Sequence, residues 1–216
     1  MTLLRTPHRG WDFYVSRGKS EVGVVVVHEI YGLLPYLESV ANQLAGAGIT
    51  AAAVDLFRGK VASSVEEGIR FRQSLVRTDL LDAIAKGIEL IKQEPGVKKV
   101  GAMGFCMGGG FALQSACDLG ADFCVDYYGM IENEEDVSKL KGPTLLILAG
   151  KDERINPWAF QKFLPAAMKY GKRVELELYP DTRHGFHRPG WEGHDPSAAE
   201  NAWDRTIRFI SELKSK

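Results

Sequence analysis

Residues 101–110 read GAMGFCMGGG and place one cysteine between a strand-like run and a glycine-rich stretch. The run Lys99 to Met103 has the short, mainly apolar pattern of a buried strand, and Met107 to Asp118 has the pattern of a helix. Cys106 therefore occupies a strand-to-helix turn. The form Gly-x-Cys-x-Gly around it is typical of an elbow whose central residue takes a strained backbone conformation and points its side chain outward.

Short β-branched runs and longer amphipathic segments alternate along the chain. Strands are expected at residues 22–27, 50–56, 99–103, 123–128, 143–149 and 174–179, and helices near residues 35–47, 64–92, 107–118, 157–170 and 196–214. This order predicts an α/β fold with a mainly parallel sheet and helices on both faces, whose ligand site lies at the carboxyl ends of the strands. Residues 10–18 are expected to add an antiparallel edge strand, and residues 1–216 to form a single domain.

The composition is that of a globular protein without a strong charge. The 216 residues are 45% hydrophobic, which is enough for a sizeable core, and 27 basic residues face 28 acidic ones. A net charge of -1 offers no broad attraction for nucleic acid or an anionic membrane. No apolar run has the pattern of a signal peptide or the length of a membrane span. We therefore expect a cytoplasmic monomer or small homo-oligomer.

The cysteines are three in number and form no CxxC pair, which favours free thiols over a disulfide framework or a cysteine zinc site. Cys106 is the one placed to react, because the helix that follows it presents unpaired N–H groups and the positive end of its dipole. Those groups favour a thiolate and an oxyanion beside it. A buried structural thiol is the ordinary alternative, and it is the interpretation kept for Cys117 and Cys124.

A nucleophile at such an elbow needs a base and an orienting acid on later strand-end loops. Asp152 and His184 directly follow the last two predicted strands, in the chain order nucleophile, acid, base. We predict a catalytic triad of Cys106, Asp152 and His184. The alternatives are an ordinary turn role for the aspartate, a solvated histidine, and Glu153 as a rival acid.

The stretch that joins the first central strand to its loop reads VVVVHEIYG over residues 24–32. It predicts that Glu29 stands at the edge of the active site, with a solvated carboxylate at a strand end as the alternative. In this architecture the loop after an early strand and the residue after the nucleophile each supply an oxyanion N–H group. The backbone amides of Ile30 and Met107 are the predicted donors.

Metal and nucleotide sites are alternatives that the spacing of the residues disfavours. His184, His187 and His194 are close in sequence, but they do not fit the HExxH pattern of a zinc hydrolase. The glycine-rich turn is not followed by the Lys-Ser/Thr pair of a P-loop, and its glycines do not form GxGxxG. We therefore expect neither a metal nor a cofactor.

Together these motifs resemble the dienelactone hydrolase family, a cysteine-using branch of the α/β-hydrolase fold that includes the carboxymethylenebutenolidases. The resemblance covers nearly the whole chain. It is carried by HEIYG at residues 28–32, DLF at 55–57, GFCMGG at 104–109, YYG at 127–129, GKD at 150–152 and HGFHR at 184–188. It implies hydrolysis of an enol-lactone ring without a cofactor.

The same resemblance implies further roles for individual residues. Glu29 would deprotonate or hold the thiol, and Arg188 would meet a carboxylate on the substrate, with Tyr127 as another substrate contact. A second arginine is implied within residues 64–92. Arg70 is the candidate carried forward, while Arg72 and Arg77 stay open and a solvated helix face is the alternative for all three.

The chemistry of a thiolate narrows the substrate class. A thiolate is a good leaving group, so a tetrahedral intermediate expels it unless the other group departs as readily. Activated esters and lactones, cleaved through a thioester, are therefore expected rather than amides. A general carboxylesterase or thioesterase would use the same triad, and a non-catalytic thiol-sensing or ligand-binding module would use the same pocket.

Overall fold

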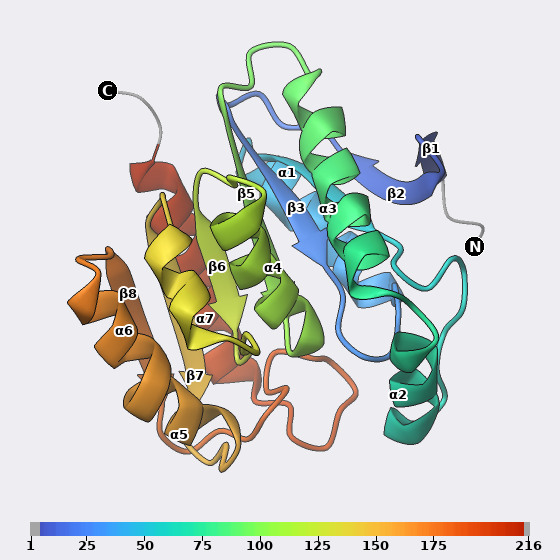
Figure 1. Cartoon of the computed structure of the whole chain (residues 1–216). Helices are drawn as coiled ribbons and strands as arrows, with labels where there is room; N and C mark the ends of the chain where they lie inside the picture. The colour runs from blue at the N-terminus through green and yellow to red at the C-terminus, as the bar shows by residue number, and fades with distance from the viewer. Residues whose placement is uncertain (1–4, 214–216) are drawn as a thin grey trace.

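Eight strands form one sheet in the order β1-β2-β4-β3-β5-β6-β7-β8 in the computed structural model, which describes residues 5–213 (Figure 1). The strands are β1 (Arg5–His8), β2 (Trp11–Ser16), β3 (Val22–Val27), β4 (Thr50–Val54), β5 (Lys99–Phe105), β6 (Cys124–Tyr127), β7 (Thr144–Ala149) and β8 (Val174–Tyr179). Strands β3 to β8 are parallel to their neighbours within this set, which confirms the predicted α/β fold. The expected antiparallel strand is β2, but an unpredicted strand, β1, pairs with it and forms the edge.

Helices cover both faces of this sheet (Figure 1). The α-helices are α1 (Pro35–Gly46), α2 (Val65–Gln73), α3 (Arg77–Lys92), α4 (Met107–Asp118), α5 (Ile155–Trp158), α6 (Leu164–Lys169) and α7 (Pro196–Glu212). A 3-10 helix, η1 (Glu134–Lys139), and a π-helical turn, η2 (Ala159–Phe163), complete the set. Within residues 5–213, no helix is both long enough and apolar enough to cross a membrane.

The strand β3 shows how the core is divided between the two faces. Val25 and Val27 belong to an apolar cluster with α3, α4 and the α5–α6 segment. Val24 and Val26 belong to a second cluster with α1 and α7. Successive side chains of a strand point to opposite faces, so a fully apolar run is what a strand buried on both sides requires.

Two helical segments differ from the sequence-based expectation. Residues 64–92 form two helices, α2 and α3, because α2 turns aside to lie at the carboxyl ends of the strands (Figure 1). There Gly68 packs so closely on the loop after β3 that a Cβ atom would lie 2.2 Å from the carbonyl oxygen of Ile30. Residues 155–169 are continuous but contain the π-helical turn. This turn ends two residues before Pro165, which has no N–H group for a helical hydrogen bond.

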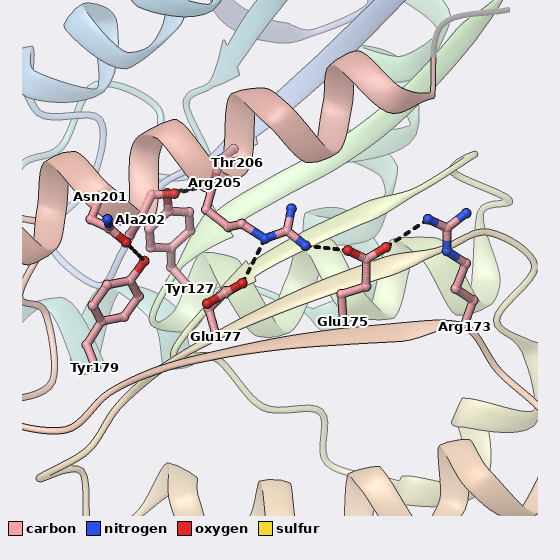
Figure 2. Close-up of polar contacts among 9 residues, drawn as sticks. All are labelled: Tyr127, Arg173, Glu175, Glu177, Tyr179, Asn201, Ala202, Arg205 and Thr206. Atoms are coloured by element: carbon pink, nitrogen blue, oxygen red, sulfur yellow. Dashed lines mark hydrogen bonds and ion pairs between the residues drawn. The ribbon is translucent and has the colours of Figure 1, made fainter. Parts of the chain in front are cut away.

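The last helix is tied to the edge strand β8 by a row of polar contacts, which Figure 2 shows. The Nε atom of Arg205 lies 2.8 Å from Glu177, and its terminal nitrogen pairs with Glu175. The hydroxyl of Tyr179 donates to Asn201 at 2.9 Å. Strand β8 and α7 flank the loop of residues 180–195, so both ends of that loop are held.

Candidate active site

Cys106 sits on a sharp turn between β5 and α4 with a φ of 54°, a conformation that costs energy in any residue but glycine. The neighbouring glycines are required because other backbone segments pack directly against them. A Cβ atom on Gly104 would lie 2.2 Å from the carbonyl oxygen of Gly108, and one on Gly108 would lie 2.2 Å from that of Val27. The elbow therefore excludes side-chain bulk and presents the thiol at the N-terminus of α4.

The structure brings Asp152 and His184 together at this edge of the sheet. The Nδ1 atom of His184 lies 2.5 Å from Oδ2 of Asp152. The other carboxylate oxygen, Oδ1, accepts the backbone N–H groups of Arg154 at 3.1 Å and Ile155 at 3.0 Å, where α5 begins. Burial raises the pKa of Asp152, but the bond to His184 and these two N–H groups outweigh it, so the pKa is lowered. Asp152 is thus an ionised group with one oxygen reserved for the imidazole.

His184 lies between that carboxylate and the thiol. Burial lowers the pKa of His184, but hydrogen bonds to Asp152 and to Cys106, with the charges of both groups, raise it to about 10. The charged imidazole is therefore strongly favoured when its two neighbours are negative. A ring in this environment is suited to accept a proton from the Cys106 thiol.

Glu29 follows β3 as a buried carboxyl group, with 3% of its surface exposed. Its Oε1 atom lies 3.2 Å from Nε of Arg188, and the guanidinium of Arg188 in turn stacks 3.8 Å above the ring of Tyr31. Burial raises the pKa of Glu29 to about 7, although the charge of Arg188, the hydroxyl of Tyr36 and His184 lower it in part. Glu29 therefore changes charge near neutral pH, and Arg188 is already engaged with it.

Ile30 and Met107, whose amides are the predicted oxyanion donors, lie at one cavity. Met107 is the first residue of α4, and Ile30 lies in the loop after β3. Both residues line the same cavity as Cys106. In the part of the chain that the structure describes, neither amide donates to a backbone carbonyl. The two N–H groups are thus available to a ligand atom, which is the condition for an oxyanion site.

These groups open into one cavity of about 540 Å³, a volume suited to a small molecule. It lies at the ends of β3, β5, β7 and β8. Its lining consists of Glu29, Ile30, Tyr31, Val65, Ile69, Cys106, Met107, Asp152, Arg154, His184, Gly185, Arg188 and Trp191. The lining thus combines polar groups that can do chemistry with apolar side chains, among them Val65 and Ile69 of α2.

Comparison with known proteins identifies the family of the chain. The model of the dienelactone hydrolase family matches residues 12–214. The chain belongs to the dienelactone hydrolase family. As a member of that family, it is a hydrolase that acts on carboxylic esters or lactones.

Relatives in this family are similar over most of their length. The carboxymethylenebutenolidase homolog of Homo sapiens is 30% identical, over 94% of this chain and 86% of its own. The carboxymethylenebutenolidase of Pseudomonas putida is 24% identical, over 89% and 86%. Among solved structures, the dienelactone hydrolase-like promiscuous phosphotriesterase from metagenomic libraries has a TM-score of 0.82 at 20% identity, covering 95% of this chain and 93% of that one. This last likeness shows the fold alone.

Tyr127, expected from the family resemblance to contact substrate, lies elsewhere. Its side chain is fully buried, and its hydroxyl bonds to Thr206 at 2.8 Å and to the carbonyl oxygen of Ala202 at 3.1 Å, both in α7 (Figure 2). It does not line the cavity. The side chain of Tyr127, on buried β6, points into the core beneath α7, so a contact with substrate stays a prediction from the family resemblance.

None of the three arginines of residues 64–92 lines the cavity, and a substrate contact from this segment stays a prediction. Arg70 is exposed on α2. The guanidinium of Arg72 lies 5.1 Å from the ring centroid of Phe111, and Arg77 pairs with Glu132 at 2.8 Å. The segment instead contributes the apolar side of α2 to the cavity wall.

A different arginine reaches the cavity, and the sequence reasoning missed it. Arg154 follows Asp152 by two residues, is exposed, and lines the cavity. Its position in the acid loop GKDER was the available signal, because a residue beside the acid must lie near the site. Trp191 also lines the cavity and was also missed; its signal was its position in the loop that carries His184.

The three histidines considered as zinc ligands have separate surroundings. His184 bonds to Asp152, whereas Nδ1 of His194 lies 2.9 Å from the carbonyl oxygen of Phe186. His187 packs against the ring of Phe105 at 4.9 Å, and burial lowers its pKa to about 4. Within residues 5–213, no group of three or more His, Cys, Asp or Glu side chains is arranged to hold a metal ion.

Proposed function

We propose that this dienelactone hydrolase family member cleaves lactones and activated esters through a Cys106–His184–Asp152 triad and a thioester intermediate. The observation that carries the proposal is the 2.5 Å bond between His184 and Asp152, next to a thiol on a strained elbow that opens into a cavity. Nucleophile, base and orienting acid are then in one chain of contacts. Glu29 would hold the thiol in the resting enzyme.

The reaction would proceed in two halves. His184 takes the proton of the Cys106 thiol as the sulfur attacks the carbonyl carbon, and the oxyanion that forms accepts N–H groups from the backbone. The bond to the leaving oxygen then breaks, and that oxygen takes the proton from His184. Water deprotonated by His184 hydrolyses the resulting thioester, which releases the carboxylic acid and restores the thiol.

The leaving group decides which substrates complete the first half. The tetrahedral intermediate expels the thiolate more readily than an amine or a poor alkoxide. An enol or phenol leaves as a stabilised anion, so the thioester forms. In a lactone the leaving oxygen stays in the same molecule, and opening of the ring gives a thioester that still carries the enol.

Trapping the acyl-enzyme tests this proposal. Acid quenching of the protein during turnover of p-nitrophenyl acetate should give one acetyl group on the peptide that contains Cys106, together with a burst of one nitrophenol per active site. Peptide mass spectrometry identifies the modified residue. Acetylation confined to another residue, or a burst without any acetylated Cys106, would contradict the thioester mechanism.

A carboxylate on the substrate would bind the guanidinium of Arg154. Arg188 is already paired with Glu29, whereas within residues 5–213 Arg154 forms no ion pair and lies at the cavity wall. Arg154→Gln should lower kcat/KM for lactones that carry a carboxylate by about 10-fold and spare neutral esters, since one charge-assisted contact at an exposed site is lost.

Arg70→Gln is the matched control for that variant, because Arg70 is also exposed but lies outside the cavity. It should leave both substrate classes unchanged. Arg188→Gln is a less selective test, because it also leaves the buried carboxyl group of Glu29 without its cation. Equal losses on acidic and neutral substrates in Arg154→Gln would remove the carboxylate-binding role.

A general carboxylesterase or thioesterase is the second candidate, and one observation favours it. Val65 and Ile69 of α2 are 40% and 43% exposed and line the cavity. Such a wall suits a neutral acyl chain as well as a ring. A panel that pairs a cis-dienelactone with p-nitrophenyl esters and thioesters of matched length separates the two candidates by their kcat/KM values.

A further inference from the structure

His28 is a fully buried histidine that the mechanism above does not use. It lies between β3 and Glu29, and its side chain does not line the cavity. The ring of Phe57 packs edge-on against it at 4.8 Å. Buried polar side chains almost always have hydrogen-bond partners, and the partners of this imidazole suggest its function.

Two hydrogen bonds define the state of this ring. The backbone N–H of Leu56 donates to Nε2 of His28 at 3.1 Å, so Nε2 carries no proton. The proton is then on Nδ1, which lies 2.6 Å from the carbonyl oxygen of Glu29 and donates to it. Burial lowers the pKa of His28, which keeps this neutral form. The ring therefore links the loop after β4 to the loop after β3.

The carbonyl that accepts this bond belongs to the same peptide group as the N–H of Ile30. In the described chain no peptide bond is cis. The C=O of Glu29 and the N–H of Ile30 therefore lie in one peptide plane and point in opposite directions. The N–H of Gly32 also donates to that carbonyl, at 3.3 Å. Two donors thus hold the carbonyl, which fixes the orientation of the N–H of Ile30 on the opposite edge of the peptide group, and Ile30 lines the cavity. A hydrogen-bonded carbonyl also makes its own N–H a better donor.

We propose that His28 is a positioning residue for the oxyanion site, which acts by fixing the Glu29–Ile30 peptide group. This inference rests on the proposed function, because it needs an oxyanion that forms next to Cys106. The competing explanation is that His28 only ties two loops together and contributes to stability. If His28 positions the peptide group, turnover depends on its bond to the Glu29 carbonyl. If His28 only ties the loops together, loss of either hydrogen bond should have the same effect on turnover.

Two conservative variants separate the hydrogen bonds. In His28→Asn the amide nitrogen takes the place of Nδ1 and keeps the bond to the Glu29 carbonyl. In His28→Gln the amide oxygen takes the place of Nε2 and keeps the bond from Leu56. We expect His28→Gln to lower kcat for p-nitrophenyl acetate by about 10- to 100-fold with little change in KM, whereas His28→Asn retains kcat within about 3-fold.

The rate at which iodoacetamide alkylates Cys106 is a second readout that separates the two explanations. If the loss of His28 disturbed the structure around Cys106, this rate would change; if only the oxyanion site is affected, it would not. The thiolate displaces iodide at a tetrahedral carbon, and no oxyanion forms in that step. The alkylation rate should therefore be the same in wild type, His28→Asn and His28→Gln. Equal losses of kcat in both variants, or alkylation that falls in parallel with kcat, would overturn the positioning role. Full turnover by Cys106→Ala would instead overturn the proposed function itself.

A measurement on the wild-type protein covers the case in which a variant does not fold. Nitrogen-15 NMR of labelled histidines distinguishes the two neutral tautomers and the imidazolium of each ring. Throughout the pH range of activity, His28 should be neutral with its proton on Nδ1. A proton on Nε2, or a charged ring, would remove the donor to the Glu29 carbonyl and overturn the proposal.

Discussion

Cys106→Ala is expected to lower kcat for p-nitrophenyl acetate by about 10⁴-fold or more, because it removes the atom that forms the thioester. The cavity, the backbone amides and the His184–Asp152 pair would remain. They can still bind the ester and polarise its carbonyl, so a small residual rate is expected rather than none. The measurement is the steady-state rate at saturating ester, with the far-ultraviolet circular dichroism spectrum as the check on folding.

Cys117→Ala is the matched control for this variant. Cys117 lies on the same helix, α4, but is buried in the apolar core. Its removal deletes a thiol without touching the cavity, so turnover and iodoacetamide sensitivity should be those of wild type. A Cys106→Ala protein that keeps turnover within about 10-fold of wild type would contradict the nucleophilic role.

Asp152→Asn is expected to lower kcat by about 10³- to 10⁴-fold, and the hydrogen bonds around the carboxylate give the reason. Oδ1 accepts two backbone N–H groups, so the amide oxygen of the asparagine must take that place. The amide nitrogen then faces Nδ1 of His184 and donates to it. This moves the ring proton to Nε2, the atom that must accept the proton of Cys106. The imidazole would be held in the wrong tautomer.

The effect on ionisation is a second readout for Asp152→Asn. The bond to Asp152 and its charge raise the pKa of His184, so their loss should lower that pKa, which NMR titration of the ring measures. Glu153→Gln is the control, because Glu153 is the exposed carboxylate next along the chain. A large loss in Glu153→Gln with near wild-type turnover in Asp152→Asn would transfer the acid role to Glu153.

The sequence was sufficient to predict the fold and the proximity of the three groups proposed as a triad, and the reason is topological. In a parallel sheet the carboxyl ends of all strands meet at one edge, so residues that directly follow β5, β7 and β8 must be neighbours. Cys106, Asp152 and His184 are such residues. No knowledge of helix orientation is needed for that inference, and the glycine spacing around Cys106 identified the elbow independently.

The substrate side of the cavity could not be predicted in the same way. The face that a helix turns toward a cavity depends on how the helix packs, and residues 64–92 do not reveal that α2 breaks away and presents Val65 and Ile69. The sequence therefore indicated Arg70, whereas Arg154 is the arginine of the acid loop that lines the cavity. His28 had no signal at all, because its hydrogen bond to Leu56 joins positions 28 residues apart.

The separate position of α2 has a consequence for how the enzyme diversifies. The reacting groups come from loops anchored in β3, β5, β7 and β8, whereas the apolar wall comes from a nine-residue helix inserted between β4 and α3. Gly68 seats that helix on the Ile30 loop by close contact with both the backbone and the side chain of Ile30. New substrate specificities can therefore arise by replacement of this one short helix, while the reacting groups on the strand-end loops stay the same.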